Sequence, residues 1–264
     1  MDGGAGFAGD GPEPEGGGID RMERLGALLF KWRSFTPLLL LPLAVPLLWR
    51  NRGAGGGGAW IASGLVLCAL GQALRLWVIG QVPDGTSGQN DVLMATRLNT
   101  GGPYARTRNP LYLGNLGITL GLCLVAHEPI VLAAVAALFA LQYRAIIAAE
   151  EGFLRQRFGA DFVAYAARVP RFWPSLGVRV PGGLRPWSLR RALWKEHNPA
   201  GSWLAIAVVL VGLDARARGE PLRPWAAALA AVAAAWLGIK AWKHQWLSGG
   251  FWRDMRRRVR DTAR

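Results

Sequence analysis

Six strongly apolar segments dominate the sequence, and they restrict the chain to folds that keep these segments out of water. Their approximate ranges are 34–49, 59–80, 110–127, 129–149, 201–213 and 224–242. A helix needs about 20 apolar residues to cross a bilayer, and within the hydrocarbon its backbone polar groups must be satisfied internally. The sequence therefore predicts an all-α fold, a multi-pass transmembrane helical bundle with about five to six spans.

Two of these segments give weaker predictions than the others. The first is short and contains Pro37, Pro42 and Pro46, so we expect it to be kinked. The fifth, 201–213, is short enough to be a tilted or partial span.

The net charge of +14 leaves two classes of partner open, nucleic acid or a membrane surface. The apolar segments favour the lipid bilayer as the partner, and we expect no nucleic-acid partner. With six spans, 24 of the 31 Lys and Arg residues collect on one side and five on the other. The side rich in basic residues is predicted to be cytoplasmic. We expect an integral protein of a bacterial cytoplasmic membrane, with both termini in the cytoplasm.

A tight helical hairpin is predicted where only His127 and Glu128 separate the third apolar segment from Pro129, a residue favoured at helix starts. The first helix would run about 24 Å from Pro110, and the second would return about 31 Å to Glu150. Glu150 and its neighbour Glu151 should therefore lie at the same membrane face as the residues around Pro110.

The rest of the chain divides by composition. Residues 1–24 are rich in Gly, Pro and acidic residues, which predicts disorder. We take 25–200 as the membrane core, with 152–198 as an interfacial helical segment. Residues 201–264 add further membrane helices and a basic tail expected to touch anionic lipid. The cysteines and histidines form no local ligand motif, so no metal site is expected, and the oligomeric state is not indicated.

The stretch GPYARTRNPLYLG, residues 102–114, contains more than a membrane anchor requires. Arg108 precedes a helix start at Pro110, where backbone N–H groups and the helix dipole favour an anion. Tyr112 offers an aromatic face, and Gly114 allows a ligand or a second helix to approach the backbone closely. Taken singly, the basic residues are ordinary juxtamembrane anchors, and Tyr112 and Gly114 are ordinary packing residues.

Two motifs together resemble a known family. GPYARTRNPLYLGN, followed after the hairpin by EEGFLRQRFGADFVAYAARVPRFWP, is similar to the isoprenylcysteine carboxyl methyltransferases, a group related to phospholipid N-methyltransferases. The resemblance covers roughly residues 60–175. It implies an integral membrane enzyme that binds S-adenosylmethionine at the cytosolic face and methylates a lipophilic or membrane-associated acceptor.

The resemblance also implies site residues. The cofactor would contact Tyr104, Arg108, Asn109, Pro110, Tyr112, Gly114, Glu150 and Glu151. The catalytic candidates are Glu150 and Arg168, and the substrate-binding candidates are Arg168 and Arg171. Arg75 is a further substrate-binding candidate, taken from its place on the second apolar segment, where it shares a face with Gln72. A carboxylate suits the cofactor's ammonium or ribose hydroxyls, whereas an arginine or a helix start suits its carboxylate.

Alternative interpretations remain at several of these residues. Glu150 and Glu151 would alone be a solvated helix end, with Glu151 paired to Arg155. Arg168 would alone snorkel from an interfacial helix, and for Arg75 snorkelling is favoured over substrate contact. Asn109 stands where many relatives have His, so a general base at this position is doubtful.

The identity of the acceptor stays open between a carboxylate, a phospholipid amine and a small thiol. Two other functions also remain open: an NADPH-dependent membrane reductase of the related sterol reductase fold, and a non-enzymatic membrane scaffold.

Overall fold

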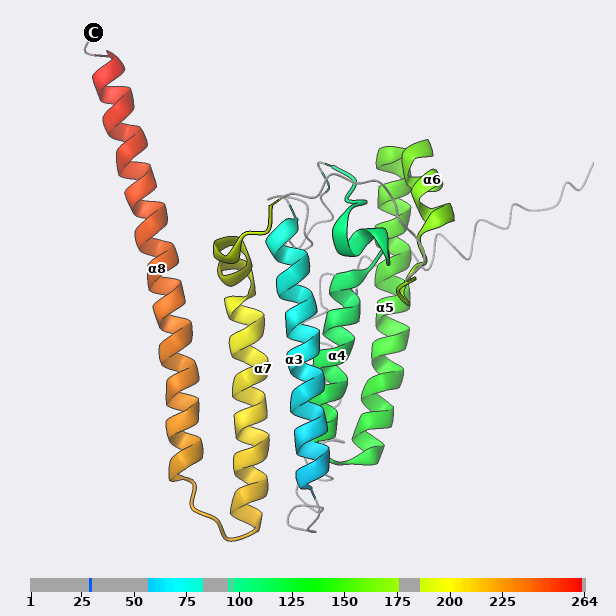
Figure 1. Cartoon of the computed structure of the whole chain (residues 1–264), viewed down its shortest axis with the longest axis vertical. Helices are drawn as coiled ribbons and strands as arrows, with labels where there is room; N and C mark the ends of the chain where they lie inside the picture. Colours follow the sequence, from blue (N-terminus) through cyan, green and yellow to red (C-terminus); the bar gives the residue numbers. More distant parts are fainter. Residues whose placement is uncertain (1–28, 30–56, 83–94, 96, 176–185, 263–264) are drawn as a thin grey trace, which may run out of the picture.

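The computed structural model describes residues 29, 57–82, 95, 97–175 and 186–262, and within these ranges every regular element is helical (Figure 1). The elements are α3 (Gly58–Gln81), η2 (Gly102–Ala105), α4 (Pro110–Ala126), α5 (Pro129–Phe158), α6 (Ala160–Arg168), α7 (Leu189–Ala217) and α8 (Arg223–Thr262). This confirms the predicted all-α membrane bundle.

Four of these helices are long and apolar enough to cross a membrane: α3, α5, α7 and the first 23 residues of α8. The helix α4 is also apolar but shorter, with 17 residues. The fifth predicted segment forms part of the 29-residue α7, which is long and apolar enough to cross a membrane. The first segment and the 1–24 terminus lie outside the described residues.

The helical hairpin is confirmed. Pro110 and Pro129 occupy the first position of α4 and α5, where a missing backbone N–H costs nothing. His127 takes a left-handed conformation with φ 41°, which reverses the chain. Glu128 then caps α5 by accepting a hydrogen bond from the backbone N–H of Ile130 at 3.3 Å.

The helices α3 and α4 touch backbone to backbone through glycines. A Cβ atom placed on Gly71 would lie 2.6 Å from the carbonyl oxygen of Gly114, and one on Gly64 would lie 2.5 Å from that of Gly121. Real Cβ atoms do not approach so closely. Small residues of this kind let membrane helices pack tightly, because lipid supplies no hydrophobic drive for their association.

Polar contacts attach α7 to α3. Glu196 receives two hydrogen bonds from Arg75, at 2.7 and 2.8 Å, and one from Gln72 at 3.2 Å. Gln72 in turn accepts a hydrogen bond from the indole N–H of Trp203. The sequence favoured snorkelling for Arg75, but that interpretation is wrong, because Glu196 balances its charge inside the bundle.

The predicted interfacial segment 152–198 contains three different structures. The helix α5 continues to Phe158, α7 already begins at Leu189, and the short α6 lies in the described part between them. Phe162 and Tyr165 of α6 are buried, whereas Val163 is exposed. This one-sided burial fits a helix at a boundary, although the interfacial location stays a prediction.

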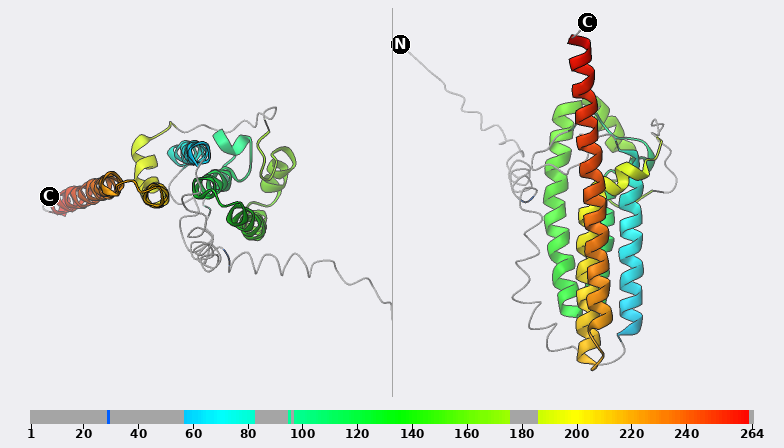
Figure 2. Two further views of the ribbon diagram at one scale, coloured as in Figure 1. Left: turned by 90° about the horizontal axis from the view of Figure 1, so that it is seen from below. Right: turned by 90° about the vertical axis from the view of Figure 1, so that its left-hand side faces the viewer.

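The polar end of the bundle gathers the end of α3, the starts of α4 and α7, and the last turns of α5 (Figure 1). The connection between α7 and α8 lies at the opposite end, and α8 returns beside α7 (Figure 2). The carboxyl end of α8 is therefore on the same side as Arg108 and Glu150. The helix α7 crosses residue 200 without a break, and the domain division drawn there stays a prediction.

Candidate functional site

The two sequence motifs bind to each other in the structure. The hydroxyl of Thr107 donates to the carbonyl of Phe172 at 2.8 Å, and the side-chain amide of Asn109 donates to the carbonyl of Arg171, also at 2.8 Å. These bonds fasten the segment before α4 to residues 170–175. Asn109 thus has a structural partner for its amide, a role that a neutral side chain fills without titrating.

The start of α4 offers fewer donors than the sequence predicts. Pro110 has no N–H, and the amides of Tyr112 and Leu113 both donate to the carbonyl of Asn109. The amide of Asn109 itself lies 3.3 Å from the hydroxyl of Thr107. The helix start is therefore largely satisfied from within, and the arginine beside it becomes the stronger candidate for binding an anion.

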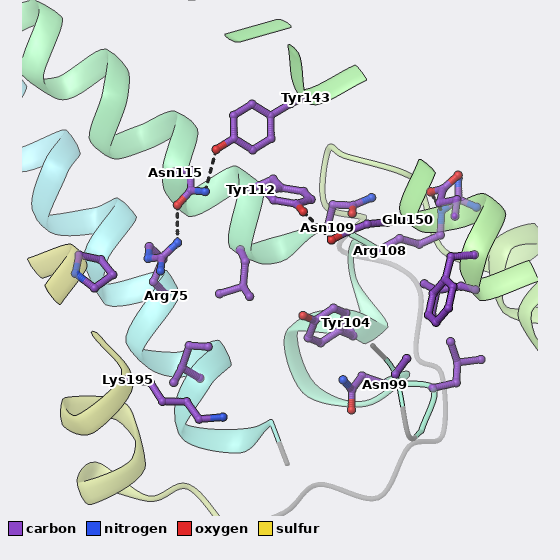
Figure 3. A pocket seen from close by; sticks show the side chains of 18 of the residues that line it. Arg75, Asn99, Tyr104, Arg108, Asn109, Tyr112, Asn115, Tyr143, Glu150 and Lys195 are labelled. Carbon is purple, nitrogen blue, oxygen red and sulfur yellow. Dashed lines mark hydrogen bonds and ion pairs between the residues drawn. The ribbon is translucent and has the colours of Figure 1, made fainter. Parts of the chain in front are cut away.

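Tyr112 and Glu150 join the two ends of the hairpin. The phenol hydroxyl of Tyr112 donates to Oε1 of Glu150 at 2.6 Å (Figure 3). The ring of Tyr112 meets Tyr143 edge to face, with centroids 4.8 Å apart, and Tyr143 stacks on Phe139. The predicted return of Glu150 to the face of Tyr112 is confirmed as geometry.

Glu151 is a buried anion held by two arginines. Its Oε2 accepts hydrogen bonds from Arg171 at 2.7 and 3.0 Å. Its Oε1 lies 3.3 Å from Nε of Arg108, an ionic contact that is not aligned as a hydrogen bond. Glu151 is only 5% exposed, and Arg155 is exposed without a bond to it among the described residues. The interpretation of Glu151 as a solvated helix end is therefore wrong.

Burial changes the acidity of the groups around this pair. It lowers the pKa of Arg108, an effect that the nearby charge of Glu151 opposes. It raises the pKa of Tyr104, and the carboxylate of Glu150 adds to this. Burial likewise raises the pKa of Tyr165, whose hydroxyl donates to the carbonyl of Tyr104 at 2.7 Å. Burial therefore favours the neutral form of both phenols.

These residues surround a cavity of about 820 Å³ that extends between α3, α4, α5 and α7. Its volume falls in the upper part of the range of about 300–1,000 Å³ typical of ligand sites. Figure 3 shows Tyr112, Arg108 and Glu150 on one side and Lys195 on another. Seven predicted site residues line the cavity: Arg75, Tyr104, Arg108, Asn109, Tyr112, Glu150 and Glu151.

Four predicted residues do not line it. Pro110 is buried at the helix start, and Gly114 faces α3, where its lack of a side chain serves helix packing. Arg171 reaches Glu151 from outside the cavity. Arg168 is exposed on the last turn of α6 and makes no contact with the carboxylates among the described residues. The geometry thus gives no support to a catalytic role for Arg168; of these two arginines, Arg171 is the one that contacts Glu151.

Several polar residues that line the cavity were missed by the sequence analysis. The side chain of Asn115 accepts a hydrogen bond from Arg75 and donates to the hydroxyl of Tyr143 at 3.0 Å. Lys195, His197 and Lys243 line the wall formed by α7 and α8. For Asn115 the available signal was a polar side chain within an apolar run, since such residues in membrane helices usually face the interior of the bundle. Lys195, His197 and Lys243 lie in polar stretches and gave no such signal.

The chemistry of the cavity fits S-adenosylmethionine. Nε of Arg108 and Oε1 of Glu151 are buried without a hydrogen-bond partner among the described residues. An orphaned donor and an orphaned acceptor of opposite charge suit a ligand that carries both an ammonium and a carboxylate. The carboxylate of Glu150, on the cavity wall, suits a cation or a pair of hydroxyls.

Comparison with known proteins identifies the family of the chain. A family model described as phospholipid methyltransferase matches residues 59–161, from α3 to the start of α6. The cobalt-zinc-cadmium resistance protein CzcN of Cupriavidus metallidurans is 31% identical over 163 residues, which cover 60% of this chain and 70% of CzcN.

The nickel-cobalt-cadmium resistance protein NccN of Alcaligenes xylosoxydans xylosoxydans is 44% identical over 85 residues, which cover 32% of this chain and 39% of NccN. No solved structure matches the chain. On the family match, and on an alignment that spans more than two thirds of CzcN, the chain belongs to the phospholipid methyltransferase family, in the group that includes the isoprenylcysteine carboxyl methyltransferases.

Proposed function

We propose that the protein is an integral membrane methyltransferase that uses S-adenosylmethionine and modifies a lipophilic or membrane-associated acceptor at the cytoplasmic boundary. One observation carries this proposal: Tyr112 hydrogen-bonds to Glu150, Arg108 contacts Glu151, and all four residues line one cavity. Family membership supplies the reaction class.

The chain's own residues have distinct parts in this proposal. Glu150, oriented by the hydroxyl of Tyr112, faces the cofactor's ammonium or ribose hydroxyls. Arg108, held in place by Glu151, binds its carboxylate. When bound, S-adenosylmethionine supplies a methyl group activated by its sulfonium. The cavity is lined by both apolar and polar side chains, and a bound cofactor that displaces water from it strengthens the electrostatic contacts made by Arg108 and Glu151.

The acceptor decides whether a base is required. A carboxylate or thiolate acceptor has no proton to lose, so positioning and electrostatics suffice. An amine acceptor must release a proton, and Glu150, whose carboxylate lines the cavity, is our candidate to receive it.

The test compares S-adenosylmethionine with NADPH by calorimetric titration of the full chain in nanodiscs. Binding of S-adenosylmethionine, without NADPH, supports the proposal. NADPH binding alone would favour the reductase, since the arginines and lysines lining the cavity also suit the phosphates of a dinucleotide. Transfer of a radioactive methyl group into extracted membrane lipid then identifies the acceptor class.

The names of the relatives place them in metal resistance. Among the described residues, no group of three His, Cys, Asp or Glu side chains is arranged to hold a metal ion. We propose that this chain contributes to metal tolerance through methylation at the membrane. A deletion strain complemented with the wild type should regain cadmium tolerance, whereas complementation with Glu150→Gln should not.

A further inference from the structure

The charged side chains that line the cavity are separated by helix. Its lining carboxylates, Glu150 and Glu151, both come from α5. The opposite wall, formed by α7 and α8, contributes Lys195, His197 and Lys243, with no carboxylate of these two helices among the described lining residues. One wall therefore suits a cation and the other an anion.

Three arginines also line the cavity: Arg97 is exposed, and the other two, Arg75 and Arg108, are each paired with a carboxylate of the protein. Arg75 makes a two-bond contact with Glu196, a side chain that is only 1% exposed. Arg108 faces Glu151. Their charges are therefore largely compensated by the protein, and a ligand meets them mainly as hydrogen-bond donors.

Lys243, on the opposite wall, is balanced differently from these two arginines. The ammonium of Lys243 donates to the backbone carbonyl of Trp194 at 3.2 Å, and no carboxylate pairs with it among the described residues. Nδ1 of His197 lies 2.9 Å from the same carbonyl. A carbonyl orients an ammonium without neutralising its charge, so two of the three N–H groups of Lys243 remain for a ligand.

Aromatic surface adjoins these cations. The indole of Trp194 lines the cavity and meets Trp242 of α8 edge to face, with centroids 5.6 Å apart. An apolar ring beside an ammonium is the arrangement expected where the headgroup of an amphiphile meets its chain. The α7–α8 wall also lies outside the family match to residues 59–161, so that match assigns it no role.

We propose that the wall formed by Lys195, Lys243, His197 and Trp194 is the subsite for the anionic group of the methyl acceptor, a phosphate or carboxylate on an apolar chain. This inference rests on the proposed function, since it assigns the α5 wall to the cofactor. Opposite charges on opposite walls then orient the acceptor across the cavity, with its headgroup held by the lysines.

The test measures saturable binding of dodecyl phosphate, dodecanoate and uncharged dodecanol to the full chain in neutral detergent by native mass spectrometry. The wild type should bind at least one anionic probe at least tenfold more tightly than dodecanol, about 1.4 kcal/mol. Lys195→Gln and Lys243→Gln should each lose about that factor. Arginine at either position should retain most of the binding, because the charge is preserved. The two anionic probes distinguish a phosphate from a carboxylate headgroup.

Lys240→Gln is the matched control, because Lys240 lies on α8 over the ring of Trp236, away from the cavity lining. It should leave probe binding within twofold. Equal losses in all three glutamine variants, or no anion preference in the wild type, would overturn the inference. If a glutamine variant does not fold, the wild-type preference and the arginine variant decide. Absence of S-adenosylmethionine binding to the wild type would instead defeat the proposed function.

Discussion

Replacing Glu150 with Gln separates charge from shape at the centre of the site. Glutamine keeps an oxygen that can accept the hydroxyl of Tyr112, now 2.6 Å from the carboxylate, but removes the negative charge. A charge-assisted hydrogen bond in a partly dry site contributes about 1.5–3 kcal/mol. Glu150→Gln should therefore raise the dissociation constant for S-adenosylmethionine roughly 10- to 150-fold. Calorimetric titration in nanodiscs measures it.

Two companion variants sharpen this measurement. Tyr112→Phe keeps the carboxylate but removes the donor that orients it, so its loss of affinity should be smaller than that of Glu150→Gln. Glu128→Gln changes a buried carboxylate at the opposite end of the hairpin, where it caps α5, and should leave the affinity unchanged. If Glu150→Gln binds within twofold of the wild type while its melting temperature is unchanged, Glu150 does not contact the cofactor.

Four further predictions follow from the geometry. Glu151→Ala should lower the free energy of unfolding by about 2–3 kcal/mol, because it leaves the buried Arg108 without its anionic partner. Arg171→Gln should lower it by less than about 1 kcal/mol, because the side chain of Arg171 is 52% exposed, and denaturant titration compares the two variants. Gly71→Ala should destabilise the bundle by about 1–3 kcal/mol, whereas Gly58→Ala, with no atom within 4 Å of the new Cβ, should not; thermal melts of both variants show the difference. Reporter fusions at residue 264 and within 214–223 should report opposite sides of the membrane, and a shared side would mean that α8 does not span. Burial raises the pKa of Tyr104 in the folded protein, so its neutral phenol contributes stability that is fully present below the ordinary tyrosine pKa of about 10 and is lost as the pH rises beyond that value. Between pH 8 and 11 the melting temperature of Tyr104→Phe should therefore fall less than that of the wild type.

The hairpin was predictable because its signals are local. Pro110 and Pro129 mark both helix starts in the sequence, and their separation fixes which residues return to the same membrane face. The meeting of Tyr112 with Glu150 follows from that length alone. Site residues that depend on one hairpin can therefore be found from its sequence.

Other features depend on contacts between distant segments, which a single sequence does not reveal. The start of α7 contains Lys195 and Glu196, and these charges hid the helix from a search for apolar runs. Glu196 is tolerated there because Arg75, 121 positions earlier, pairs with it. That separation explains why Arg75 looked like a snorkelling residue. Glu151 looked like part of a solvated helix end because its partners, Arg108 and Arg171, lie outside its own helix.

The glycine contact between α3 and α4 also bears on how a lipophilic molecule reaches the cavity. With the backbones of Gly71 and Gly114 in direct contact, the seam between these two helices is too narrow for an acyl chain. Lateral entry from the bilayer must therefore pass around this pair. The helix α7 meets α3 through side chains such as Glu196, which can change rotamer, so ligand exchange should depend on the α7 side while α3 and α4 act as a fixed wall.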